Sequence, residues 1–212
     1  MKDVLLIVFG WSLGLFSPAI ASLFSRQNRK KETQKVISEE LKDIKIRLAL
    51  MAFQVNSRLG TLDKEFLIWT KNQIAPYDGY EELQHLQKIF SRPDFDNPQK
   101  LAELVSVFNH AGFTPSSFSE ITTGIIDSNY TNIAVLPREF FVKVLEIKFQ
   151  LGVLNHESKS SNDYLRMTFD SSLSNVNREI IDQELRNKSE RISKKSVFIV
   201  EKINRVIIPK SK

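Results

Sequence analysis

An uncharged, apolar stretch near the N-terminus constrains this chain more than any other feature of its sequence. It runs over the 21 residues from Val4 to Phe24, and the basic run Ser25–Lys31 follows it at once. About 20 apolar residues are enough for a helix to cross the ~30 Å hydrocarbon core of a bilayer. The sequence therefore predicts a transmembrane helix over residues 4–24, preceded by a short extracytoplasmic tail of residues 1–3.

A cleaved signal peptide is the main alternative to a retained anchor, because Ala19-Ile20-Ala21 fits the small-x-small pattern of a cleavage site. Retention is favoured because the tail carries no net side-chain charge and the apolar run exceeds the about 7–15 residues of a signal. The basic cluster follows the run, and such flanks stay in the cytoplasm. We therefore expect a single-pass protein of the cell inner (cytoplasmic) membrane, with its N-terminus outside and its C-terminal domain in the cytoplasm.

The remainder of the chain has the composition of a folded, helical domain. Residues 25–31 form a basic juxtamembrane segment, and residues 32–212 are long enough for one well-packed domain. Seven Gly and seven Pro are few for a turn-rich β-fold, and the absence of Cys excludes disulfides and thiolate sites. Helical periodicity predicts an all-α bundle of about six or seven helices, in which the first and last long helices lie antiparallel.

The first helix after the anchor, from Glu32 to about Leu59, has apolar residues on two sides. One stripe follows the 4-3 spacing of a heptad seam and consists of Ile37, Leu41, Ile44, Leu48, Met51 and Val55. A second stripe, on the opposite side, consists of Ile46, Leu50 and Phe53. Because six seam positions are few for a coiled-coil stalk, a core helix is the favoured interpretation.

Start and stop signals divide the middle of the chain into further helices. Helices are predicted over 62–75 and 80–90, and others begin at Asn97-Pro98, at Thr114-Pro115 and after Pro137. The polar stretch 155–162 predicts a turn.

A last helix is predicted from Asp163 to the end of the fold. Its first part has Phe169, Leu173, Val176 and Ile180 as the expected inner face. Its later part has a narrow stripe of Leu185, Ile192, Ile199, Ile203 and Val206, which suits contact with a single helix. The β-branched runs 197–200 and 206–208 leave a strand as the alternative there, since periodicity alone does not separate the two.

Basic residues are concentrated at the two ends of the chain. Residues 186–212 carry nine basic and two acidic side chains, whereas residues 32–185 are acidic overall. Anionic headgroups attract each nearby Lys or Arg by about 1 kcal/mol. We expect contacts with an anionic lipid bilayer from Arg26, Arg29, Lys30, Lys31, Lys188, Arg191, Lys194 and Lys195. Nucleic acid is disfavoured as the partner because aromatic residues do not alternate with these basic ones.

Small residues in the predicted anchor provide a possible surface for self-association. Gly10 and Gly14 form a G-x-x-x-G pattern, and Ala21 lies on the same face. Such residues let two helices approach closely in lipid, although Gly is also common in membrane helices in general. A homo-oligomer formed through Gly10, Gly14 and Ala21 is therefore one alternative state of the chain.

The sequence contains no catalytic, metal or cofactor motif that rises above chance. Glu82 and His85 have a spacing used in pairs by di-metal bundles, but it occurs once, and Asp94 and Asp96 fit a turn better than a cation site. We therefore expect a non-enzymatic, membrane-anchored interaction, scaffold or sensing module with an unidentified protein partner. Two alternatives are a membrane effector that oligomerises through its anchor and perturbs the bilayer, and a hydrolase assembled only in space.

Overall fold

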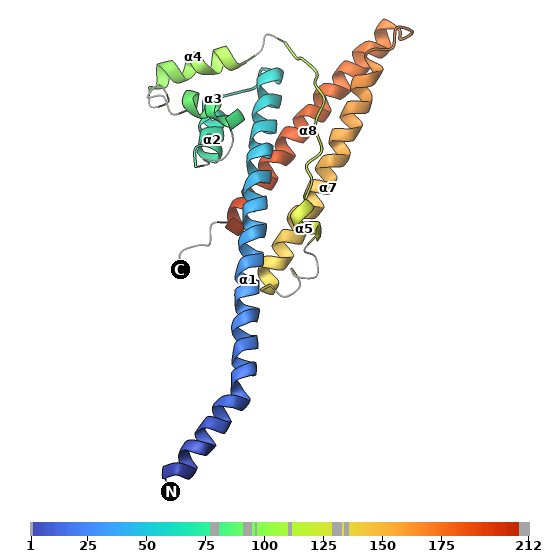
Figure 1. Ribbon diagram of the computed structural model, residues 1–212. Coiled ribbons are helices and arrows are strands. Elements are labelled where there is room, and N and C mark those ends of the chain that lie inside the picture. Colours follow the sequence, from blue (N-terminus) through green and yellow to red (C-terminus); the bar gives the residue numbers. More distant parts are fainter. Residues whose placement is uncertain are drawn as a thin grey trace.

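A computed structural model has an all-α fold and describes residues 2–76, 81–90, 95, 97–109, 112–128, 133 and 136–207 (Figure 1). In these ranges the chain forms seven helices: α1 (Lys2–Leu59), α2 (Lys64–Ile74), α3 (Glu81–Phe90), α4 (Pro98–Phe108), α5 (Gly124–Ser128), α7 (Arg138–Met167) and α8 (Asn175–Ile207). The predicted all-α class is confirmed, and the ambiguous C-terminal runs are helical as far as Ile207.

Helix α1 is continuous over 58 residues and joins the apolar N-terminal segment to the core of the domain. No Gly or Pro interrupts residues 25–59, so nothing local ends the helix before Gly60, which has a positive φ of 68°. The N-terminal part of α1 projects alone beyond the other helices (Figure 1). Side chains 25–36 are exposed or half-buried, and Ile37 is the first that is fully buried.

Two hydrophobic clusters use different faces of the C-terminal half of α1. The first cluster lies between α1, α7 and α8 and includes Ile37, Leu41, Ile44, Leu48 and Val55. The second joins α1 to the small group α2–α4 and includes Ile46 and Phe53, with Leu50 packed against it. Both predicted stripes are confirmed, and α1 is a core helix as expected.

Helices α2 and α3 begin and end within about two residues of their predicted bounds, and α4 begins at the predicted Pro98. Asp63 accepts a hydrogen bond from the Phe66 N–H at the start of α2. Asn97 accepts from the N–H groups of the second and third residues of α4, and Pro98 is the first residue of that helix. These caps satisfy N–H groups that a helix leaves without an internal partner.

Helix α8 runs antiparallel to α1, as predicted. The Asn56 amide donates to Ser193 Oγ (2.6 Å), and Ser196 Oγ donates to Met51 Sδ (3.7 Å). Residue numbers therefore decrease along α1 in the direction in which they increase along α8. The expectation of a single helical partner for α8 is wrong, because α8 packs on α7 as well. The buried serines Ser189, Ser193 and Ser196 widen its buried face.

The turn predicted over residues 155–162 is wrong, since α7 runs through this stretch without interruption. Ser158 and Ser161 are fully buried on its core side, where their small side chains allow close packing. The chain reverses later, between Met167 and Asn175, where Asp170 accepts hydrogen bonds from the Ser172 N–H and hydroxyl.

This later turn overturns the predicted inner face of the last helix. Phe169, Val176 and Ile180 are exposed near the tip of the α7–α8 hairpin, and Leu173 is only half-buried. Helical spacing identified residues that could form one face, but it did not reveal that the chain reverses between them.

The helix predicted after Thr114-Pro115 is also wrong over most of its length. Residues 113–123 have no regular secondary structure, and only the five residues of α5 are helical. In Figure 1 this segment runs beside α7 as a thin strand-like trace that ends in α5. We call residues 113–123 the strap.

Candidate interaction surface

The residues predicted to pack the anchor lie outside what the structure describes at the side-chain level. The backbone at Gly10, Gly14 and Ala21 is helical within α1, but side chains 2–21, 23 and 24 are not described. In the described part of the chain, no helix is both long and apolar enough to span a membrane. Packing between anchors through these three residues stays a prediction.

The structure does not bring the two predicted groups of membrane-contacting basic residues together. Arg26, Arg29, Lys30 and Lys31 lie on the projecting part of α1, whereas Lys188, Arg191, Lys194 and Lys195 lie in the middle of α8. Ser193, which lies within the second group on α8, contacts Asn56 of α1. Asn56 is 25 residues beyond Lys31, the last residue of the first group. At 1.5 Å per residue, the two groups are about 38 Å apart along α1.

Two of the α8 lysines are engaged within the fold. Lys188 is 9% exposed; its Nζ lies 3.9 Å from Glu157 Oε2 and 5.1 Å from the centre of the Tyr164 ring. Lys195 donates to Gln150 Oε1 at 3.3 Å. Burial makes Lys188 a structural residue of the α7–α8 contact rather than a surface cation.

Two asparagines of α7 hold the strap by its backbone, and sequence patterns did not identify them. The Phe118 N–H donates to Asn162 Oδ1 (2.8 Å), and the Asn162 amide donates to the Phe118 carbonyl (2.8 Å). Asn155 makes the same pair of bonds with Ile121, at 3.0 and 2.9 Å. The two asparagines are seven residues apart, so they lie on one face of α7. The seven-residue spacing of Asn155 and Asn162 is the sequence signal that could have identified this pair.

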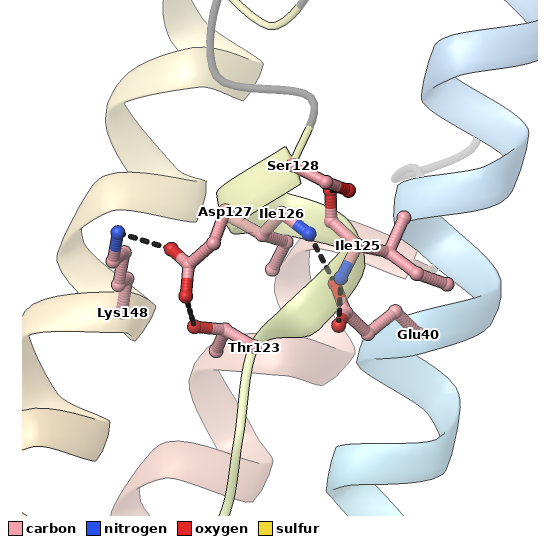
Figure 2. Close-up of polar contacts among 7 residues, drawn as sticks. All are labelled: Glu40, Thr123, Ile125, Ile126, Asp127, Ser128 and Lys148. Carbon is pink, nitrogen blue, oxygen red and sulfur yellow. Dashed lines mark hydrogen bonds and ion pairs between the residues drawn. The ribbon is translucent and has the colours of Figure 1, made fainter.

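A polar cluster fixes the end of the strap between α1 and α7 (Figure 2). The Glu40 carboxylate on α1 accepts hydrogen bonds from the N–H groups of Ile125 and Ile126, at 2.8 and 2.7 Å. Thr123 donates to Asp127 (2.9 Å), which also pairs with Lys148 of α7. The hydrogen bond from Lys148 lowers the pKa of Asp127 below its usual value. Glu40 thus caps α5 in place of a residue of the strap itself.

Replacing Glu40 by glutamine is expected to loosen α5 by about 1.5–3 kcal/mol, because charge-assisted bonds to two N–H groups are lost or weakened. Hydrogen exchange of the Ile125 and Ile126 amides measures this change. The matched control is Glu39→Gln, since Glu39 is exposed and pairs with Lys42 of the same helix, three residues away. Equal exchange in both variants would contradict the capping role.

A shallow groove lies along the outer side of the α7–α8 hairpin. One part, between α7 and α8, has a volume of about 560 Å³ and is lined by Gln150, Val153, Glu157, Arg191, Lys194, Lys195 and Phe198. An adjoining part of about 590 Å³ shares Val153 and continues along α7 past Phe149, Gly152 and His156. The floor is mainly apolar, and basic side chains of α8 border one side.

The same hairpin carries most of the exposed apolar side chains of the described residues. Seven of the eleven large ones belong to it: Val142, Phe149, Met167, Phe169, Val176, Ile180 and Phe198. Phe149 is 68% exposed and Phe198 is 44% exposed. Of these seven, Phe149 and Phe198 line the groove. Exposed apolar groups bordered by charge are typical of sites that bind other macromolecules.

A metal site is not formed by the described residues. No group of three or more potential metal ligands occurs among them. The side chains of Glu82 and His85, and the whole of Asp94 and Asp96, lie outside the described residues. The outer surface of the α7–α8 hairpin is therefore the candidate functional surface. Comparisons with known protein families, curated proteins and solved structures find no significant match to this chain.

Proposed function

We propose that this chain is a membrane-tethered interaction module. Residues 4–24 anchor it, its domain lies on the cytoplasmic side, and the outer surface of the α7–α8 hairpin binds a protein partner. The observation that carries the proposal is the continuity of α1, in which one helix of 58 residues contains both the apolar segment and the central core stripe. A tether built in this way holds the domain by a helix rather than by a flexible linker.

The stretch between the apolar segment and the bundle sets the distance from the bilayer. Residues 25–36 are mostly exposed and helical, which corresponds to a stalk of about 18 Å at 1.5 Å per residue. The four basic residues Arg26, Arg29, Lys30 and Lys31 lie at the start of this stalk, within reach of anionic headgroups. The α7–α8 surface stands further out, where another protein has access to it.

Membrane retention and topology test the tether. The full chain expressed in bacteria should resist alkaline extraction from membranes, and a C-terminal reporter should be active in the cytoplasm. Leu13→Arg should release the chain, because an arginine at the centre of a span costs about 2.5–3.5 kcal/mol.

The matched control is Ser25→Arg, which adds the same charge just outside the apolar segment and should leave the chain in the membrane. Recovery of the wild type in the soluble fraction would overturn the proposal, as would reporter activity on the far side of the membrane.

A further inference from the structure

Helix α8 has a second stripe of side chains on the face opposite its buried one. Its buried residues include Ile181, Leu185, Ile192, Ile199 and Ile203. At 100° per residue, the opposite face contains Val176, Ile180, Asn187, Arg191, Lys194 and Phe198, and all six are exposed. The spacing of 4, 7, 4, 3 and 4 keeps these six residues on one face of the helix over 23 residues. A surface helix ordinarily has apolar residues on one face only, the face that packs on the core.

The two ends of the outer stripe lie symmetrically about Asn187, whereas Ile180, seven residues before it, is mirrored by Lys194, seven residues after it. Val176 lies eleven residues before it and Phe198 eleven residues after it, so both ends are apolar; Val176 is 66% exposed. Acidic Glu179 and Glu184 precede Asn187, and basic Arg191 and Lys194 follow it. Two antiparallel copies centred on Asn187 would therefore place the apolar ends of one stripe against those of the other. The same arrangement brings these acidic side chains of one copy near the basic side chains of the other.

The flanks of the stripe give the same register. Glu184 flanks the stripe on the side of Arg191, and Glu179 flanks it on the side of Lys194. In the antiparallel pair each of these two acids therefore lies within one residue of a base of the other copy. A parallel pair would instead place Arg191 on Arg191 and Lys194 on Lys194. Lys194 Nζ lies 3.6 Å from Glu190 Oε2 in an exposed contact, which it exchanges for the new one. Charge complementarity thus selects the antiparallel arrangement.

We propose that the outer face of the α7–α8 hairpin binds a second copy of this chain, antiparallel and centred on Asn187. The two Asn187 side chains meet at the two-fold axis, as in an isologous dimer. Val176 of each copy packs on Phe198 of the other. The groove beside Phe198, which is also lined by Val153, then lies next to Val176 of the other copy.

This pairing is independent of the tether, but it restricts how the tether is used. In each chain α1 runs antiparallel to α8, so the pair places the two N-terminal segments at opposite ends. Pairing and insertion of both segments into one flat bilayer therefore exclude each other. Where the proposed tether also holds, the pair joins chains anchored in two facing membranes.

Introduced cysteines test the register directly, since the chain has none of its own. The full chain in detergent carrying Asn187→Cys should form a disulfide dimer under mild oxidation. Val176→Cys and Phe198→Cys should cross-link only when the two variants are mixed, because equal residues lie about 33 Å apart at 1.5 Å per residue. The control is Lys159→Cys, an exposed position of α7 outside the six-residue stripe of α8, which should stay monomeric.

A charge exchange tests the contact energetics by light scattering over a range of concentrations. Arg191→Glu should weaken dimerisation at least tenfold, and adding Glu184→Arg should restore it. A monomer at every concentration would overturn the pairing, and so would equal cross-linking of the Lys159→Cys control. Pairing through the anchor would give dimers that the Arg191→Glu change does not affect. Failure of the topology experiment leaves these outcomes unchanged, because they are measured in detergent.

Discussion

Replacing Leu48 by alanine is expected to lower the free energy of unfolding of the α1–α7–α8 bundle by about 2–5 kcal/mol. Leu48 is fully buried in the first cluster, where α1 meets α7 and α8, together with Val144, Ile147 and Ile199. Truncation removes apolar contacts and leaves a cavity that three long helices cannot readily close. Hydrogen exchange of the full chain in detergent should show reduced protection in all three helices.

The informative control is Phe53→Ala, because Phe53 belongs to the second cluster on another face of α1. Its ring makes edge contacts with Phe90 at 6.1 Å and Phe108 at 5.3 Å between ring centres. This change, typically worth about 3–5 kcal/mol, should reduce protection in α2–α4 and leave α7 and α8 protected. Identical exchange patterns in the two variants would mean that both clusters unfold as one cooperative unit.

Removing both strap asparagines is expected to release the strap while the bundle stays folded. Asn155→Ala with Asn162→Ala deletes four hydrogen bonds and leaves the N–H and C=O of Phe118 and Ile121 without these partners. An orphaned polar group costs about 1–3 kcal/mol where it stays buried, and Ile121 is buried. Exchange of the amides at positions 118 and 121 should accelerate by about 100-fold, which corresponds to about 2.7 kcal/mol.

Two further variants show whether the asparagine amides cause this effect. Asn155→Asp keeps the acceptor for the Ile121 N–H but loses the donor to its carbonyl, so an intermediate acceleration is expected. Lys159→Ala lies between the two asparagines on α7, is exposed, and should change stability by less than about 0.5 kcal/mol. Unchanged exchange in the double variant would show that other contacts hold the strap.

The strap also explains a sequence prediction that the structure overturned. Thr114-Pro115 and the later apolar residues have the local pattern of a helix, yet 113–123 is extended. A helix satisfies backbone groups internally, whereas here Asn155 and Asn162 satisfy part of them from α7. Residues 34 to 44 positions away in the sequence therefore decided the local conformation.

Sequence patterns identified only some of the residues of the candidate surface. The basic residues of α8 were identified, but Lys188 is buried against Glu157 and Tyr164 and does not belong to the surface. Val176 and Ile180 were expected to face inward and are exposed, 66% and 57% respectively. Periodicity shows which residues share a face of a helix, but it does not show which face the other helices cover.

Apolar spacing by itself determined the all-α class, the two faces of α1 and the buried stripe of α8, because a helix must repeat its apolar residues at a fixed period to bury them. Tertiary structure alone decided what the polar side chains do. Asn155, Asn162, Glu40 and the buried serines of α7 and α8 could equally have faced solvent. Their partners come from distant segments, and the polarity of a residue does not reveal whether such a segment will reach it.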